Sequence, residues 1–338
     1  MKTALLLLFF FYFVNANSQV ISGKIVDIKN KPLSGANIYF DGTTIATTSN
    51  EKGNFTIKTN TKLNSVLVIS FIGFQTQYIS NVSLNNLQIV LKENIDLMKE
   101  VVIKKDRFTR KQKLQLFREQ FLGQTKAGKK ATIQNEDDIY FEYNEKTRTL
   151  NAFSDKPLVV NNEVLGYKIV YEIQLFEVSF WKISISSNEV TKSFYAGVSR
   201  FEETDSSENT LKQREKSYQG SQLHFFRNLA IEKWGKDDFL LFVGSFQDNP
   251  KSWFSVNTNY DFKIVTISKQ DKKLSSIKNV VAEFNILFKK KQQSKVIFAT
   301  PEFQIDAFGN NSNIDSIYFS GYLATLKVGD MLPMDYKM

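Results

Sequence analysis

The amino-acid sequence predicts a mainly β protein, in which a seven-stranded Greek-key sandwich precedes a β-rich α+β domain with two helices. Aromatic residues make up 14% of the 338 residues, with 30 phenylalanines and 13 tyrosines, and such side chains favour strands. Short alternating segments are separated by turns rich in Gly, Asn and Pro along most of the chain. Hydrophobic residues at 42% and charged residues at 23% are typical of a globular protein with a sizeable core.

The first 18 residues have the features of a secretory signal peptide. Lys2 precedes an apolar run at residues 4–14, and small residues Ala16 and Ser18 follow it. The run is shorter than the roughly 20 residues of a membrane-spanning helix, and no later segment reaches that length. We therefore expect export, a mature chain that starts near Gln19, and no transmembrane span after cleavage. The expected location is the periplasm or the periphery of the outer membrane, with secretion as the alternative.

Two residue types are nearly missing. The chain has no cysteine and one histidine, His224, which excludes disulfides, thiolate nucleophiles and any metal site that needs two histidines. The sequence also lacks a nucleophile elbow, a phosphate loop and a dinucleotide-binding fingerprint. We expect no catalytic residues, no metal and no cofactor. The net charge of +9 indicates either contact with an anionic envelope surface or simply a solvated surface, and no motif favours nucleic acid.

The N-terminal region is expected to form the sandwich. Pro32 and Gly35 mark one turn, Asp41 and Gly42 a hairpin, and Gly53 a third turn. The expected strands are residues 20–27, 36–40, 43–48, 55–58, 66–71 and 88–91.

This region also carries a family resemblance. Residues 23–27, 32–38, 42–43 and 53–55, with residues 68–74 and 97–103, resemble the carboxypeptidase regulatory-like domain. The resemblance implies a transthyretin-like sandwich over residues 19–103. It also implies an exported Bacteroidetes protein, because such domains often stand ahead of TonB-dependent transporters. It covers the accessory domain only, since a zinc carboxypeptidase needs two histidines on the metal.

Residues 104–338 are expected to form one β-rich domain. A helix near residues 108–122 is predicted from the apolar stripe Leu114, Phe117 and Phe121, and Gly123 ends it. A second helix is predicted near residues 217–234. The expected strands are residues 139–143, 147–153, 158–160, 165–176, 178–186, 239–243, 262–267, 281–288, 296–299 and 314–322.

A second, weaker resemblance runs through this region. Short motifs at residues 121–123, 158–162, 165–171, 195–197, 214–226 and 321–333 occur in order. They are similar to the C-terminal part of Bacteroidetes proteins that carry the same module and have no assigned activity. The resemblance therefore transfers no catalytic residues.

Five side chains are candidate ligand or partner contacts. His224 is either a general base or a structural residue of its helix. A hydrolase would place it in a cleft with a carboxylate and a hydroxyl, whereas a structural histidine would be buried with a backbone partner. Arg214 and Tyr218 precede the second expected helix, where donors favour an anion or simply cap the helix. Trp181 and Trp234 form either the floor of a carbohydrate site or ordinary core.

The sequence leads to one functional hypothesis and two alternatives. We expect a non-catalytic exported envelope protein that acts as an interaction or scaffold module and binds an envelope protein. The first alternative is a carbohydrate- or peptide-binding protein of a nutrient-uptake system, which requires a concave aromatic site with a tryptophan and acids. The second is a hydrolase of unrecognised type that uses His224.

Overall fold

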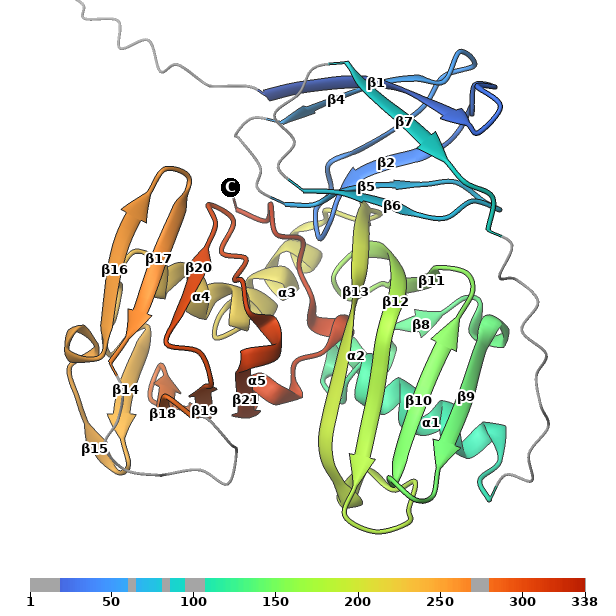
Figure 1. Cartoon of the computed structure of the whole chain (residues 1–338). Helices are drawn as coiled ribbons and strands as arrows, with labels where there is room; N and C mark the ends of the chain where they lie inside the picture. Colours follow the sequence, from blue (N-terminus) through green and yellow to red (C-terminus); the bar gives the residue numbers. More distant parts are fainter. Residues whose placement is uncertain (1–18, 60–64, 81–85, 95–106, 269–279, 338) are drawn as a thin grey trace, which may run out of the picture.

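The structure is a computed structural model that describes residues 19–59, 65–80, 86–94, 107–268 and 280–337 (Figure 1). Most of its regular elements are strands, which confirms the mainly β fold. The expected signal peptide at residues 1–18 and the expected exit strand at residues 97–103 lie outside the described residues. Within the described ranges, no helix combines the length and apolar character needed to cross a membrane.

Residues 19–94 form the N-terminal sandwich. Its two sheets have the strand orders β4-β1-β7 and β3-β2-β5-β6. The described part of this unit therefore contains seven strands, as the sequence predicts. Alternation places Phe55 and Ile57 of β4 in the core while their neighbours face outward. The strands are β1 (Gln19–Asp27), β2 (Asn37–Phe40), β3 (Ala46–Thr48), β4 (Asn54–Thr59), β5 (Leu67–Ser70), β6 (Gln77–Ile79) and β7 (Leu87–Leu91).

One pairing differs from the antiparallel arrangement that the short turns predict. Strands β1 and β7 pair in parallel, with Gly23 opposite Leu87 and Asp27 opposite Leu91. Parallel neighbours need a long crossover connection, and here the second sheet supplies it between the two strands.

A six-stranded sheet and two helices form the central unit. Strand β12 is 14 residues long and pairs with β13 along almost its whole length. Helix α1 contains the expected stripe, and it packs Phe117 against Phe176 in a tilted arrangement and Phe121 edge-on against Tyr171. The elements are α1 (Arg110–Phe121), α2 (Lys126–Lys130), β8 (Thr132–Ile133), β9 (Ile139–Asn144), β10 (Thr149–Ser154), β11 (Leu158–Asn162), β12 (Tyr167–Phe180) and β13 (Val190–Glu203).

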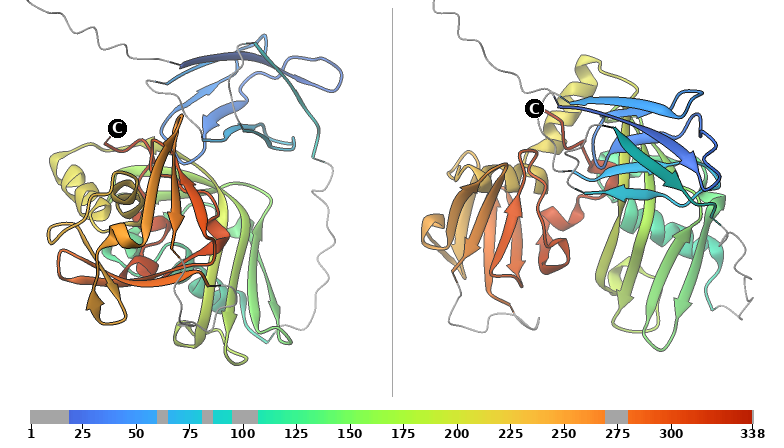
Figure 2. Two further views of the ribbon diagram at one scale, coloured as in Figure 1. Left: turned by 60° about the vertical axis from the view of Figure 1, so that its left-hand side comes forward. Right: turned by 45° about the horizontal axis from the view of Figure 1, so that its top comes forward.

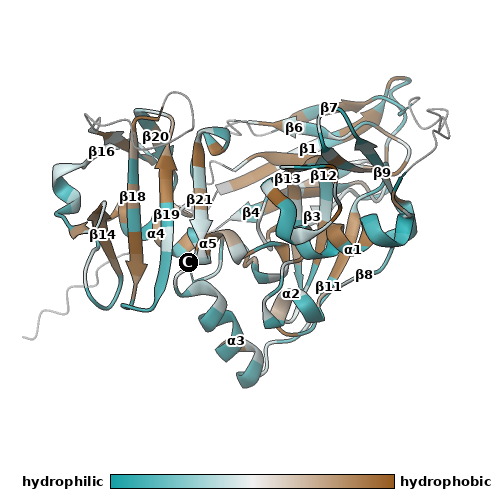
Figure 3. Cartoon of the chain, turned by 90° about the horizontal axis from the view of Figure 1, so that it is seen from below, coloured by the Kyte–Doolittle hydropathy of each residue, from teal (hydrophilic) through white to brown (hydrophobic). Residues whose placement is uncertain are grey.

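The prediction of one helix at residues 217–234 is wrong. The chain instead forms α3 (Glu208–Tyr218) and α4 (Gln222–Ala230). Gly220 separates them in a left-handed conformation with φ of 76°, and a Cβ there would lie 2.8 Å from the Phe288 ring. Ser221 then caps α4 by accepting a hydrogen bond from the His224 backbone N–H. Helix α3 is largely hydrophilic (Figure 3), so it gives no apolar stripe for the sequence to reveal.

The C-terminal unit combines two further sheets with α4. Their orders are β15-β14-β18-β19-β21 and β16-β17-β20, and Phe225, Phe226 and Leu229 of α4 join their common core. Its other elements are β14 (Phe239–Val243), β15 (Phe246–Gln247), β16 (Phe254–Asn259), β17 (Phe262–Ile267), β18 (Ala282–Phe288), β19 (Gln292–Phe298), β20 (Glu302–Ile305), β21 (Ile317–Gly321) and α5 (Tyr322–Thr325). The described part of residues 104–338 thus holds five α-helices, where the sequence predicts two.

The apolar residues of the central and C-terminal units collect in different cores. Phe117, Phe176 and Phe201 belong to one, whereas Phe225 and Phe284 belong to the other. We propose from these cores that the region expected as one domain consists of two units.

The N-terminal sandwich docks on the outer edge of β13 (Figure 2). The Gly42 N–H donates to the Ser199 carbonyl at 2.7 Å, and the Phe201 N–H donates to the Thr43 carbonyl at 3.0 Å. The Asp41 carboxylate accepts from the Ser199 N–H at 2.7 Å. These bonds use backbone groups that an open sheet edge would leave exposed.

The last residues of the chain connect all three units, and we call residues 327–337 the C-terminal strap. The Gly329 carbonyl accepts from the Asn162 side chain of the central unit at 2.7 Å. The Met334 N–H donates to the Gly42 carbonyl of the N-terminal sandwich at 2.7 Å. Arg227 of α4 donates to the carbonyls of Met334 and Tyr336. The strap therefore fixes the units relative to one another.

Replacing Asn162 tests the anchor of the strap. The fully buried Asn162 side chain donates to Gly329 and accepts from the Leu165 N–H, so Asn162→Ala leaves both backbone groups without their partner. We expect the free energy of unfolding to fall by about 2 to 4 kcal/mol in urea denaturation. Asn161→Ala on the same strand is the control and should change it by less than about 0.5 kcal/mol. Equal effects of the two variants would contradict this role.

Candidate functional site

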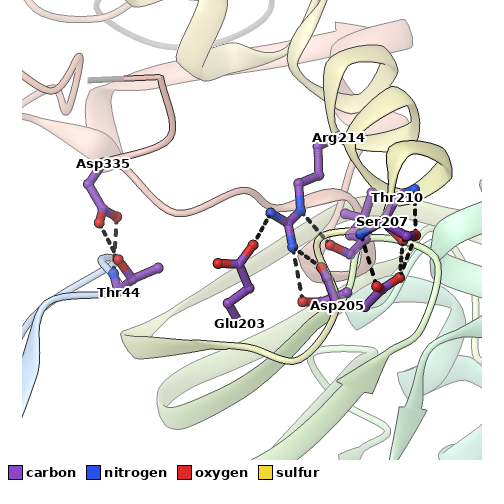
Figure 4. A network of polar contacts seen from close by, with 9 residues as sticks. Thr44, Glu203, Asp205, Ser207, Thr210, Arg214 and Asp335 are labelled. Atoms are coloured by element: carbon purple, nitrogen blue, oxygen red, sulfur yellow. Dashed lines mark hydrogen bonds and ion pairs between the residues drawn. The ribbon is translucent and has the colours of Figure 1, made fainter.

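Arg214 lies at the buried contact between α3 and the central unit (Figure 4). It is only 3% exposed, and its guanidinium donates to the carbonyls of Leu165, Gly166 and Asp205. It also pairs with the Glu203 carboxylate at 2.6 Å and lies 4.0 Å from the centre of the Tyr167 ring. Its hydrogen bonds thus hold α3 on the sheet, an arrangement that favours a structural role over the expected ligand contact.

Arg214→Met measures this contact. The substitution preserves most of the side-chain volume but leaves three carbonyl groups without their charged donor, and we expect a loss of about 3 kcal/mol in the free energy of unfolding. The control is Lys212→Ala on the same helix, which removes an exposed pair with Glu208 and should cost less than about 0.5 kcal/mol. Urea denaturation of both variants gives the comparison, and an Arg214→Met variant as stable as the control would refute the role.

His224 lies in an aromatic cluster at the start of α4. Its side chain accepts a hydrogen bond at Nδ1 from the Gly220 N–H at 3.1 Å, and its ring stacks on Tyr218 with centroids 4.8 Å apart. Phe239 and Phe288 enclose the other sides. Burial is the main cause that lowers the pKa of His224 from 6.5 to about 4.

This geometry favours the structural interpretation of His224. The residue is 8% exposed and has the backbone partner that a structural histidine should have. The Asp238 carboxylate lies 3.7 Å from Nε2, but Ser221, the neighbouring hydroxyl, accepts the His224 backbone N–H as the helix cap. The His224 ring is therefore a neutral hydrogen-bond acceptor, and the Ser221 hydroxyl is a helix cap rather than an activated nucleophile.

The depressed pKa of His224 predicts a pH-dependent contribution to stability. The contribution is fully present above pH 6.5, where the unfolded state is also neutral, and is lost as the pH falls through about 4. Between about pH 7.5 and pH 4 we expect the wild type to lose about 3 kcal/mol more than His224→Gln, which cannot gain the proton. Urea denaturation at both pH values measures the difference, and parallel profiles would rule out the shift.

A cavity of about 740 Å³ opens beside α4, and we call it the α4 cavity. His224 and Tyr218 line one side, the turn between β16 and β17 lines another, and Lys337 of the strap closes part of it. The loop after β20 completes the wall with Asp306 and Gly309. The cavity therefore joins segments that are far apart in the sequence.

The α4 cavity carries more cationic than anionic side chains. Arg227, Lys233, Lys263 and Lys337 line it, against Asp261 and Asp306. The Asp306 carboxylate accepts from two backbone N–H groups of its own loop, and burial is the main cause that raises its pKa.

The two tryptophans lie elsewhere. Trp181 is 56% exposed at the end of the β12–β13 hairpin, where Lys182 lies over its ring. Trp234 stacks on Phe254 and lines a smaller cavity of about 370 Å³ with Asp248. Of the five expected contact residues, the structure brings only His224 and Tyr218 together at one cavity.

Sequence reasoning missed four residues of the α4 cavity: Arg227, Tyr260, Lys263 and Lys337. Tyr260 has a φ of 50° in the turn between β16 and β17. The alternating pattern of these two strands was the sequence signal that could have located this turn. Arg227 is a charged residue within an otherwise apolar helix, which was a second signal. Across the described ranges, no group of three His, Asp or Glu side chains is arranged to hold a metal ion.

The comparisons with known proteins concern mainly the N-terminal sandwich. Residues 21–103 match the CarboxypepD_reg-like domain family. Because of this similarity, we call the N-terminal sandwich the regulatory-like domain. Over 88 residues the chain is 32% identical to the TonB-dependent receptor SusC of Bacteroides thetaiotaomicron, which covers 26% of this chain and 8% of the receptor. The match thus concerns about a quarter of this chain and a small part of the receptor.

Two solved structures share a small region with the chain. Both are interface mutants of a type II Cohesin-X-Dockerin complex from Acetivibrio cellulolyticus. The N-terminal mutant has 21% identity over 22% of this chain and 57% of that chain, with a TM-score of 0.19. The C-terminal mutant has 23% identity over 22% and 51%, with a TM-score of 0.17. Scores this low support no structural or functional argument.

Proposed function

We propose that this protein is a non-catalytic, exported envelope protein that acts as an interaction module at the periplasm or the outer-membrane periphery. The regulatory-like domain and the partial similarity to a TonB-dependent receptor support a role related to nutrient uptake. The observation that carries the proposal is the backbone docking of this domain on β13 through Gly42 and Thr43. A domain held in this way presents its remaining loops in a fixed orientation.

One end of the regulatory-like domain offers exposed apolar side chains. Ile28 is 63% exposed and Ile72 is 87% exposed, in the loops that follow β1 and β5. The two loops lie at the same end, because Asp27 pairs with Leu91 and the nearby Glu93 bridges to Phe74. We propose that this end contacts the envelope partner, since apolar side chains on fixed loops are suited to a protein interface.

A second candidate function is the binding of a small carbohydrate or peptide ligand. The α4 cavity favours it, because 740 Å³ falls within the usual size range of ligand sites. The hydrolase alternative gains no comparable support, because Nδ1 of His224 already accepts a hydrogen bond from the Gly220 N–H.

Site-specific crosslinking tests the interaction proposal. We expect a photo-crosslinking amino acid at Ile72 to capture one reproducible envelope protein in cells, because this side chain is exposed at the proposed contact. The control position is Phe246, which is 81% exposed on the C-terminal unit and should not capture the same protein. Capture from both positions, or from neither, would overturn the proposed contact, and mass spectrometry identifies the product.

A further inference from the structure

We propose that the α4 cavity binds a small ligand that carries a carboxylate group on a ring-containing body. This proposal deepens the ligand-binding alternative and does not depend on the envelope partner at Ile72. It rests on two cationic side chains that form no direct ion pair among the described residues, on an exposed aromatic side chain that lines the cavity, and on the cavity volume.

Arg227 gives the cavity a fixed positive charge. Its Nε donates to the Phe308 carbonyl at 2.9 Å, while its terminal nitrogens donate to Tyr336 and Met334. These three bonds use three of the five N–H groups of the guanidinium. Among the described residues Arg227 forms no direct ion pair, although it acts electrostatically on the Asp306 carboxylate, which lines the same cavity. Its charge is therefore held in place without being neutralised by a direct partner.

Lys263 adds a second cation without a carboxylate partner among the described residues. Among the described residues its Nζ donates to one partner, the Thr258 hydroxyl at 2.7 Å, so the ammonium group keeps further N–H groups for a ligand. The other two cations are compensated, since Lys233 pairs with Asp238 and Lys337 pairs with Glu215. The two cations without a direct ion pair among the described residues thus lie between α4 and the β16–β17 turn, in a cavity that Asp261 and Asp306 also line.

Tyr260 supplies an aromatic surface at the same turn. It is 96% exposed although it lines the cavity, and its backbone has φ of 50°. A left-handed conformation is unusual for an aromatic residue and costs roughly 1 kcal/mol or more. Phe262 and Ile231 continue the apolar lining. A ring placed on this surface would bring an attached carboxylate toward Lys263 and Arg227.

The size of the cavity restricts the ligand to about two rings or two residues. Typical ligand sites have about 300 to 1,000 Å³, and the 740 Å³ of the α4 cavity lies inside that interval. Two kinds of ring-bearing carboxylate fit this description, an acidic disaccharide and an aromatic acyl amino acid. Digalacturonic acid and hippurate represent them, and galactobiose and hippuramide are their neutral counterparts.

Titration calorimetry on the full mature chain tests the proposal. We expect at least one of the two acids to bind at least about tenfold more tightly than its neutral counterpart, with affinity that falls as salt increases. Lys263→Ala should weaken that binding at least about fivefold, because it removes the flexible cation. Tyr260→Ala should weaken both the acid and any residual binding of the neutral compound.

Two matched variants provide the controls. Lys251→Ala removes an exposed lysine of the same unit outside the cavity, and Phe246→Ala removes an exposed aromatic ring outside it. Both should bind the acid as the wild type does. Equal affinity for acid and neutral compound, equal effects of Lys263→Ala and Lys251→Ala, or no binding of either acid at about 1 mM would overturn the proposal. The crosslinking result at Ile72 is unaffected by any of these outcomes.

Discussion

The arrangement of the three units depends on the C-terminal strap. Residues 327–337 bind the central unit through Asn162 and Thr125, the regulatory-like domain through Gly42 and Thr44, and α4 through Arg227. Each unit has its own core, and apolar contacts also cross between units, since Phe308 packs in the core of the N-terminal sandwich and Val198 of β13 packs with Tyr39 and Val68. The strap joins groups as far apart in sequence as Thr44 and Asp335, which are separated by 291 positions, and closing so long a loop costs conformational entropy. The end of the chain thus acts as the connection between units.

Buried carboxylates at the contacts between the units make the stability of these contacts depend on pH. Burial is the main cause that raises the pKa of Asp41, at the contact with β13, to about 6. Burial likewise raises the pKa of Asp330, within the strap, to about 6. Raised carboxylate pKa values contribute stability that is fully present below about 3.8 and is lost as the pH rises through about 6. The contribution of His224 to stability changes in the opposite direction over a similar pH interval. Acid therefore stabilises the contacts at Asp41 and Asp330 and destabilises the α4 core.

Local sequence patterns predicted individual strands and helices, but they did not predict contacts between segments that are far apart in the sequence. The alternation around Phe55 and the stripe around Phe117 each located an element, because both report a single buried face. Helix α3 could not be found in this way, since its contact with the sheet is one buried arginine rather than an apolar stripe. At the site, the scarcity of histidine directed attention to His224, whereas Tyr260 and Lys263 looked like ordinary residues of an exposed hairpin. Their significance appears only when the fold places them opposite α4.

Two residues, Arg227 and Lys337, connect the strap with the α4 cavity, and this links the two functional proposals. Arg227 binds the strap carbonyls while it lines the cavity, and Lys337 belongs to both. A ligand that binds the folded cavity stabilises the folded state by mass action, and it therefore also favours the state in which Arg227 holds the strap. Because the strap binds Gly42 of the regulatory-like domain, ligand binding and domain docking are coupled, and such coupling acts equally in both directions. Occupation of the cavity would thus strengthen the fixed orientation in which Ile28 and Ile72 are presented, so that ligand binding and partner binding become two properties of one assembly.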